Sequence, residues 1–385
     1  MDYNLTEEQQ MIKEVARAIA EEKIKPLREK MDRESKLAPE IKEELGRSDL
    51  LRVFIPEEYE GLGMGMFGMC LAIEEISIVD GGVATAYAAN GLGAIPIILF
   101  GSEDQKKKYL PLIGRGEKWA AFALTEPEAG SDAGNVKLKA KDDGNYYILN
   151  GNKIFISNAG EADIYCVIVS TDPERGIRGL SAIIVEKGYE GFSFGKEEDK
   201  LGIRAAATRE LVFTNCKVPK ENLIGREGAG FMVAMKTFDN SRVGVAAQAV
   251  GIAEGALREA VSYANTRKQF GKKIGEFQAI QIKLAEMATK VEAARALTYQ
   301  VARYIDGGGK RISKESSMAK LFASDVAMEV TIEAIQVFGG YGYMKDYPVE
   351  KMMRDAKITQ IYEGTNEIQK LVIASELLKE EIKKK

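Results

Sequence analysis

The segment VKLKAKDDGNYYILNG, residues 136–151, decides how the middle of this chain folds. Apolar and charged residues alternate from Val136 to Ala140, which places them on opposite faces of a half-buried strand. Asp143-Gly144 follows and favours a hairpin, because a type I′ turn needs positive φ at its central residues. Asn150-Gly151 repeats this turn signal. The segment therefore predicts antiparallel strands connected by tight turns.

Helical patterns flank this strand-rich region on both sides. Before it, apolar residues such as Ile12, Val15 and Ile19 recur at helical spacing. After it, an apolar face that runs from Ile280 to Val301 predicts a helix bundle. No long helix interrupts the strands, so an antiparallel barrel or sandwich is favoured over βαβ units. The expected α+β fold has a helical N-terminal domain (residues 1–116), a central β-domain (117–227) and a C-terminal helical bundle (228–385).

The composition excludes several classes of protein. The 54 Lys and Arg residues nearly balance the 58 Asp and Glu residues, which argues against a nucleic-acid binder. The chain has no histidine, so catalytic triads and histidine metal sites are excluded, and a proton must be moved by a carboxylate, Lys, Tyr or Cys. The three cysteines are widely spaced without a CxxC pair, so we interpret them as buried hydrophobic residues in a reducing compartment, and we expect no metal site.

The N-terminal segment predicts neither export nor a membrane anchor. It is acidic and helical in pattern, and it lacks the basic stretch and apolar run of a signal peptide. In our interpretation, no segment approaches the roughly 18 consecutive uncharged apolar residues that a membrane helix needs. The sequence therefore predicts a cytoplasmic protein without a membrane span.

The segment IYEGTNEIQKLVI, residues 361–373, contains the best candidate for proton transfer. Gly364 permits a sharp turn, and Asn366 followed by Gln369 resembles a capping box at the start of a helix. Glu363 would then lie just before a helix N-terminus. These residues alone leave two possibilities open: a functional carboxylate, or a surface carboxylate that the helix dipole favours.

Three other segments have patterns typical of ligand loops. FALTEPEAGSDAG (122–134) contains a polar turn that can point backbone N–H groups at an anion, although it is neither GxGxxG nor a P-loop. TRKQFGKKIGEFQAI (266–280) clusters basic residues that suit either a phosphate-rich ligand or a helix C-terminus. The paired glycines within residues 336–342 allow a ligand to approach the backbone closely.

Together these segments resemble the acyl-CoA dehydrogenase family, and the likeness covers essentially the whole chain. The segments that carry it are EEISIVDGG (74–82), FGSEDQKKKYLP (100–111), ALTEPEAGSDAG (123–134), NGNKIFISNAGEAD (150–163), LGIRAAAT (201–208), VPKENLIGREGAGF (218–231), TRKQFGKKIGEFQAI (266–280), QVFGGYGY (336–343) and MRDAKITQIYEGTNEIQ (353–369). The short- and medium-chain enzymes look most similar. The resemblance implies a C-terminal four-helix domain, a homotetramer, FAD between the β-domain and the bundle, and an electron-transferring flavoprotein as partner.

The resemblance also implies roles for individual residues. Those expected to hold FAD are Leu124, Thr125, Ser131, Phe155, Ile156, Ser157, Arg267, Phe270, Gln278, Gln336, Gly340, Thr365 and Glu367. Those expected to meet the acyl-CoA are Ser131, Phe238, Asp239, Arg242 and Gly364. The family often has Trp at the place of Phe155, and the only tryptophan here is Trp119. Stacking on the flavin would then use a smaller ring.

In the mechanism that the resemblance implies, Glu363 removes the α-proton of the thioester while the β-hydride leaves for flavin. Some branches of the family place the base at the position of Ser241, and a serine cannot do this work unaided. Another branch binds a terminal carboxylate with arginine at the place of Val83, so a dicarboxylic substrate is not expected. An oxygen-dependent oxidase and a non-catalytic assembly protein are the alternative functions. Gly91 and Gly93 leave room for a bulky acyl group or allow close helix contact, and we favour the second interpretation.

Overall fold

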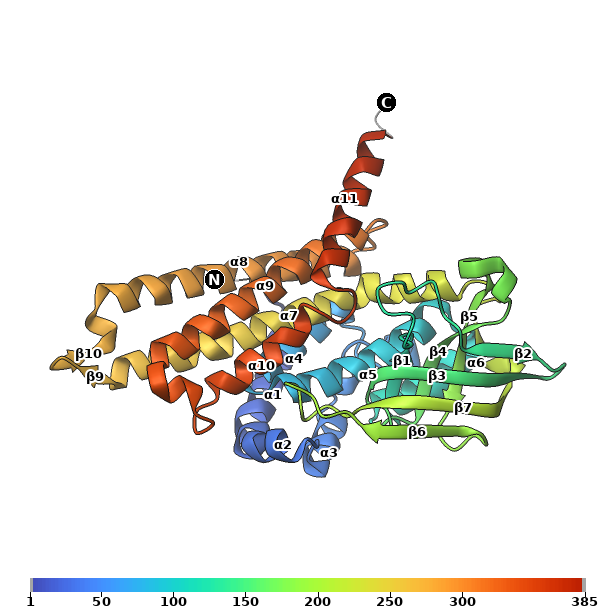
Figure 1. Ribbon diagram of the computed structural model, residues 1–385, viewed down its shortest axis with the longest axis horizontal. Helices are drawn as coiled ribbons and strands as arrows, with labels where there is room; N and C mark the ends of the chain where they lie inside the picture. Colours follow the sequence, from blue (N-terminus) through green and yellow to red (C-terminus); the bar gives the residue numbers. More distant parts are fainter. Residues whose placement is uncertain (1–2, 383–385) are drawn as a thin grey trace.

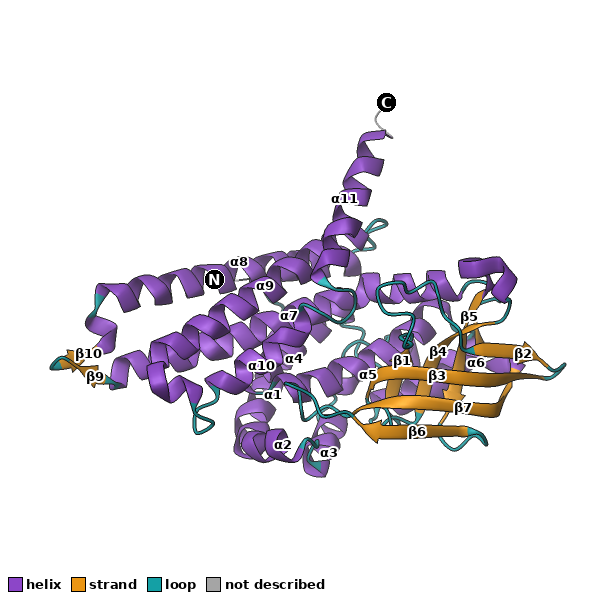
Figure 2. Cartoon of the chain, in the orientation of Figure 1, coloured by secondary structure: helices purple, strands orange, loops and turns teal. Residues whose placement is uncertain are grey.

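The computed structural model describes residues 3–382, which run through helices, then strands, then helices, as the sequence predicts (Figure 1). Figure 2 shows the large sheet at one end of the molecule and the long helices extending away from it. The N-terminal helices are α1 (Glu7–Ile19), α2 (Arg28–Glu34), α3 (Pro39–Arg47), α4 (Gly65–Val79), α5 (Gly81–Phe100) and α6 (Glu103–Gly114). The C-terminal helices are α7 (Gly230–Thr266), α8 (Gln278–Asp306), α9 (Ser313–Phe338), α10 (Val349–Thr359) and α11 (Asn366–Ile382).

The central region forms one eight-stranded sheet in the order β6-β7-β3-β2-β4-β5-β8, with β1 paired to β4. Its strands are β1 (Ala120–Ala123), β2 (Lys139–Asp142), β3 (Tyr146–Ser157), β4 (Ile164–Ser170), β5 (Leu180–Glu186), β6 (Phe192–Glu197), β7 (Thr208–Pro219) and β8 (Leu223–Ile224). Most pairs are antiparallel, as expected, but β1 and β2 both pair with β4 in parallel, so the sheet is mixed. A separate hairpin joins β9 (Lys268–Gln269) to β10 (Lys272–Lys273).

The two predicted turns have different outcomes. Asp143-Gly144 connects β2 to the antiparallel β3, which confirms the hairpin, but only Gly144 of the two has positive φ, at +77°, so the predicted type I′ turn is wrong. The prediction for Asn150-Gly151 is wrong, because both residues lie inside β3, where the pairing with β7 shifts register. Gly151 has φ +134°, and a β-carbon there would lie 3.1 Å from the Leu138 Cα. The glycine therefore serves a β-bulge under close packing, not a turn.

The predicted strand at Val136–Ala140 is also shorter than expected. The strand β2 begins only at Lys139, because the Glu126 carboxylate binds the preceding backbone. Its oxygens accept hydrogen bonds from the N–H groups of Lys137, at 2.5 Å, and Leu138, at 3.0 Å. A side chain thus replaces the sheet partner that alternation alone predicts.

Helix α5 contradicts the expectation that no segment is long and apolar enough to span a membrane. Its twenty residues contain no charged side chain, and it is long and apolar enough to cross a membrane by length and composition. However, 72% of its most apolar window is buried inside the fold, where α5 contacts β1, α4 and α7. A β-carbon at Gly93 would lie 2.5 Å from the Ala121 backbone nitrogen, so the helix rests directly on β1. Burial in the core accounts for the apolar composition of α5, and close contact is the role of Gly93.

The long helices α7, α8 and α9 pack on one another and form the bundle, with α10 against α7 and α9. Helix α4 of the N-terminal region packs on α7 and α8, so the helical regions share a core. All three cysteines lie buried in this fold with free thiols, as expected for hydrophobic residues. Helix α11 extends away from the bundle (Figure 1). The loop between α10 and α11 contains Glu363.

Candidate active site

The loop that holds Glu363 has a strained backbone that its neighbours fix in place. Glu363 and Gly364 both have left-handed backbone, with φ +53° and +94°. The Gln369 side chain donates hydrogen bonds to the carbonyl oxygens of Glu363, at 3.0 Å, and Gly364, at 2.9 Å. Lys320 of α9 donates a further bond to the Gly364 oxygen at 2.9 Å. A non-glycine residue held in this region of φ costs roughly 1–3 kcal/mol, which points to function at Glu363.

The predicted capping box at this helix is wrong in its details. Thr365 caps α11, because its hydroxyl accepts a hydrogen bond from the Ile368 N–H at 3.3 Å. Asn366 is instead buried, and its side chain binds Lys320, Ser324 and Asp325 of α9. Gln369 reaches back to the loop carbonyls described above. These side chains fix the loop to the bundle, which no local capping pattern encodes.

The carboxyl group of Glu363 lies in a setting that suits a base. Ser241 of α7 donates a hydrogen bond to its Oε2 at 2.5 Å, and Arg242 donates to its backbone oxygen at 3.3 Å. Burial disfavours the charged carboxylate and raises the Glu363 pKa to about 7, although the Ser241 bond and the charges of Arg242 and Lys320 oppose the rise. A carboxyl group with this pKa exchanges protons readily near neutral pH.

A cavity of about 120 Å³ opens in front of this carboxyl group. The cofactor residues predicted from the resemblance that line it are Leu124, Thr125, Phe155, Ile156 and Ser157. Phe238 lines it as predicted for substrate contact. Ser241, considered above as an alternative position of the base, also lines it, and the remaining wall comes from residues that the sequence interpretation did not identify: Met69, Thr85, Ala88, Ala89, Leu92, Phe122, Gly244, Val245, Gln248 and Tyr362. Their recurrence every three or four residues on α5 and α7 is the one signal that could have indicated them, but core helices share it.

Tyr362 is fixed by a buried polar chain that the sequence interpretation missed. Its hydroxyl donates a hydrogen bond to the Gln248 side chain, which in turn donates to the Thr85 hydroxyl at 2.8 Å and the Gly81 oxygen at 2.9 Å. Burial raises the pKa of Tyr362, so the phenol stays protonated. The chain connects α5, α7 and the loop, and it positions the residue next to Glu363.

A buried ion pair between Lys153 and Glu126 stabilises the strand residues beside the cavity. The ammonium group of Lys153 lies 2.7 Å from the Glu126 carboxylate and donates a bond to the Leu124 oxygen at 2.8 Å. The neighbouring residue Thr125 accepts a backbone bond from Ile154 at 2.9 Å. Phe155 has φ +57° and leaves 62% of its surface exposed at the cavity. A fixed backbone turn and an exposed aromatic ring together fit the planar ring of a flavin.

Other predicted FAD residues gather at the opposite end of the bundle from the sheet (Figure 1). Arg267 and Gly340 line one open cavity of about 600 Å³, where the Arg267 guanidinium lies 5.2 Å from the Tyr341 ring centroid. A β-carbon at Gly340 would meet nothing within 4 Å, which leaves room for a ligand. Phe270 lies at the tip of the β9–β10 hairpin with 94% of its surface exposed. Gln278 and Gln336 belong to α8 and α9 and do not line this cavity.

The structure does not place every predicted residue at the cavity. Ser131 is exposed on its loop, and Glu367 is exposed on α11. Asp239 is buried and pairs with Arg242 at 3.1 Å, away from the cavity wall. Gly364 and Thr365 shape the loop beside it. The candidate site is therefore a compact group around Glu363 and a distant group around Arg267.

Comparison with known proteins identifies the family of this chain. Family models described as the N-terminal, middle and C-terminal domains of acyl-CoA dehydrogenase match residues 6–117, 121–216 and 228–378. A short-chain-specific acyl-CoA dehydrogenase of Clostridium acetobutylicum is 47% identical over 98% of this chain and 100% of its own. An acryloyl-CoA reductase (NADH) of Anaerotignum propionicum is 48% identical over 98% of this chain and 96% of its own.

Two solved structures are also closely similar. The butyryl-CoA dehydrogenase of Megasphaera elsdenii has a TM-score of 0.96 and 47% identity, covering 98% of this chain and 100% of its own. A chain from a structural study of the electron transferring flavoprotein of Acidaminococcus fermentans has a TM-score of 0.96 and 51% identity, with the same coverage. Similarity at this level extends over the whole described fold.

Proposed function

Because this chain belongs to the acyl-CoA dehydrogenase family, we propose that it is an FAD-dependent enzyme that converts an acyl-CoA thioester to the trans-2-enoyl-CoA. Electrons then pass to an electron-transferring flavoprotein. The similarity to a chain from the structural study of the Acidaminococcus fermentans electron transferring flavoprotein supports this step. Bound FAD supplies the acceptor for the hydride that leaves the β-carbon. The protein's own residues supply the base, the polarisation of the thioester and a dry cavity.

The observation that carries this proposal is the carboxyl group of Glu363 facing an apolar cavity with a pKa near 7. The α-proton of a thioester is a weak acid, so its removal needs a base within contact of the α-carbon. Ser241 supports the role by donating a hydrogen bond to the carboxylate, and it is not itself the base. No other carboxylate lines this cavity among the described residues.

Charge that develops on the thioester oxygen also needs a hydrogen-bond donor. The Glu363 backbone N–H has no hydrogen-bond partner within residues 3–382. The left-handed turn at Glu363 and Gly364 holds this donor in a rigid loop, so it needs no reorganisation during the reaction. We assign it the polarisation of the thioester oxygen. Phe238 would pack on the substrate, while Arg242, paired with Asp239, acts through its hydrogen bond to the Glu363 carbonyl.

The two separated groups of cofactor residues support an oligomer that shares FAD between subunits, and the family resemblance makes a homotetramer our proposal. One chain places Leu124, Thr125 and Phe155 at the sheet and Arg267 and Phe270 at the far end of the bundle. An elongated FAD held by the first group in one subunit would meet the second group of another subunit. Exposed apolar residues at Phe270, Leu371 and Leu378 are available for such contacts. We also propose a cytoplasmic location, which the similarity to dehydrogenases of bacterial cells supports.

The proposal is tested with purified protein loaded with FAD. Butyryl-CoA added without oxygen should bleach the flavin absorbance within a single turnover. A protein that stays colourless after incubation with FAD, or a flavin that no acyl-CoA bleaches, would contradict the dehydrogenase. An oxygen electrode then separates a dehydrogenase from an oxidase, because only the oxidase consumes oxygen rapidly with butyryl-CoA.

Reduction of an enoyl-CoA is a second candidate function. It is favoured by the 48% identity to the acryloyl-CoA reductase of Anaerotignum propionicum. A carboxyl group with a pKa near 7 is protonated in part of the molecules at neutral pH, so Glu363 can also return a proton to the α-carbon. Reoxidation of the chemically reduced enzyme by crotonyl-CoA measures this direction. No reoxidation would exclude it.

A further inference from the structure

The side chain of Met69 ends the catalytic cavity on the side of α4. Met69 lines the cavity, and only 2% of its surface is exposed. Its tip lies in the notch that Gly91 leaves in α5, where a β-carbon would stand 2.3 Å from the Met69 Cε and 3.6 Å from the Phe54 Cε1. The role of Gly91 is thus close contact with a methionine of the neighbouring helix.

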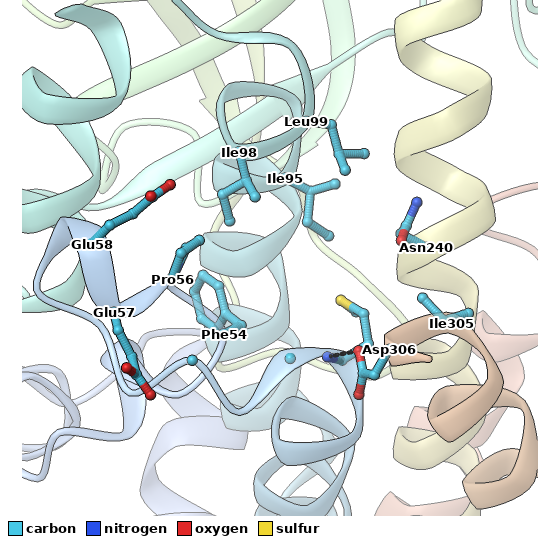
Figure 3. A pocket seen from close by; sticks show the side chains of 13 residues that line it. Phe54, Pro56, Glu57, Glu58, Ile95, Ile98, Leu99, Asn240, Ile305 and Asp306 are labelled. Carbon is cyan, nitrogen blue, oxygen red and sulfur yellow. Dashed lines mark hydrogen bonds between the residues drawn. The ribbon is translucent and has the colours of Figure 1, made fainter. Parts of the chain in front are cut away.

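A second, larger cavity of about 650 Å³ is lined by residues that include Phe54 and Ile95 (Figure 3). Phe54 is part of its wall and also lies next to the β-carbon position at Gly91 that the tip of Met69 occupies. Ile95 lies one helical turn after Gly91 on α5 and also faces this cavity, with Ile98 and Leu99 beyond it (Figure 3). Its lining is mainly apolar, and its acidic residues are Glu57, Glu58 and Asp306. Met69 in the wall of the catalytic cavity and Phe54 in the wall of the larger cavity are therefore neighbours at Gly91.

The catalytic cavity is small, and Met69 shares its wall with the residues assigned to the flavin. Its volume of about 120 Å³ is small compared with the roughly 300–1,000 Å³ of ordinary ligand pockets. The unbranched, flexible side chain of methionine fills irregular gaps in apolar cores well. Shortening it would remove the tip that closes the notch, whereas neighbouring wall residues such as Ala88 and Ala89 are already small.

We propose that Met69, seated on Gly91, sets the upper limit on acyl chain length and restricts the enzyme to short straight acyl groups of about four carbons. When Met69 is replaced by a smaller residue, the larger cavity lined by Phe54 and Ile95 accepts the tail of a longer acyl group. This inference rests on the proposed acyl-CoA dehydrogenase activity.

The test compares Met69→Ala with the wild-type holoenzyme on butyryl-, hexanoyl- and octanoyl-CoA. Each buried methylene contributes roughly a fourfold gain in binding. The ratio of kcat/KM for octanoyl-CoA over butyryl-CoA should therefore rise at least about tenfold in Met69→Ala. Binding measured by calorimetry in a Glu363→Gln background should show the same change without turnover. An unchanged ratio in a soluble, FAD-loaded Met69→Ala protein would overturn the inference.

Two further variants complete the test. Met66→Ala removes a methionine of the same helix that lines only the larger cavity, so its octanoyl-to-butyryl ratio should equal that of the wild type. A tenfold rise in Met66→Ala would contradict the role of Met69. If Met69→Ala does not fold, Met69→Val provides the smaller truncation, with hexanoyl-CoA as the substrate that should gain. A wild type that oxidises octanoyl-CoA as readily as butyryl-CoA would also overturn the inference, whereas failure to oxidise any acyl-CoA would refute the dehydrogenase itself.

Discussion

The catalytic cavity and the distant hairpin differ in how their residues are held. Around Glu363, hydrogen bonds from Gln369, Lys320 and Ser241 fix both the backbone and the carboxyl group within one chain. At the hairpin, Phe270 also has positive φ, at +53°, but 94% of its surface is exposed. Acid–base chemistry needs a group removed from water, because burial is what moves its pKa. Binding of phosphates needs an open cationic surface, which a second subunit can complete.

The two regions therefore predict different consequences of substitution. Changes in the cavity should alter the chemical step or the fold. Changes at the hairpin should alter the retention of FAD and leave the chemistry of the loaded enzyme intact.

Glu363→Gln should have the largest effect on the reaction. The amide keeps the shape of the side chain but cannot accept the proton, so flavin reduction should slow by roughly 10²–10⁴-fold. Single-turnover bleaching by saturating butyryl-CoA measures that step. Affinity for the substrate should change little, since the loop contacts to the Glu363 carbonyl remain. Bleaching at the wild-type rate would place the base elsewhere.

Lys153→Met should have the largest effect on the fold of the cavity region. It leaves the buried Glu126 carboxylate without its cation, and breaking a buried pair from one side costs about 3–5 kcal/mol. Chemical denaturation measures the loss of stability. The double variant Glu126→Gln and Lys153→Met should recover part of it, because no unpaired charge remains. Equal stability of the single and double variants would show that the ion pair is not responsible.

Arg267→Ala should test the hairpin region. Loss of a charge-assisted bond to phosphate should weaken FAD binding by about 1.5–3 kcal/mol, roughly ten- to a hundred-fold. Titration of the apoprotein with FAD measures this affinity. The rate of bleaching in the fully loaded variant should stay close to that of the wild type. Lys272→Ala, on the same hairpin, is the matched control, because its ammonium group lies over the Phe277 ring instead. Equal affinity in Arg267→Ala and wild type would refute the assignment at Arg267.

Ser241→Ala should give the smallest effect, a shift in pH dependence. Only the deprotonated Glu363 accepts a proton, so the bleaching rate of the wild type should rise with pH through about 7. The Ser241 bond lowers the pKa of Glu363, so its removal should move the midpoint to higher pH. Thr237→Ala, one turn earlier on α7, is the control, because within residues 3–382 its hydroxyl binds the Val233 oxygen and does not contact Glu363. A midpoint that stays fixed or falls in Ser241→Ala would contradict this account.

Local sequence patterns correctly predicted those parts of the structure whose conformation short-range interactions determine. Asp143-Gly144 forms its hairpin because turn geometry depends on those residues themselves. Asn150-Gly151 has residues that favour a turn equally well, yet it lies within the strand β3, because β3 pairs with β7 on both sides of it. The start of β2 is likewise decided by Glu126, a residue outside the strand. The errors arise where a distant segment supplies the hydrogen bonds.

The sequence by itself determined the order of helices and strands, the family resemblance and Glu363 as the candidate base. These depend on periodicity and on motifs that a linear chain displays. Tertiary structure alone decided the environment of Glu363, the contact of Met69 with Gly91 and the separation of the two cofactor groups. Burial and long-range hydrogen bonds shift a pKa or close a cavity, and both depend on which segments meet in space.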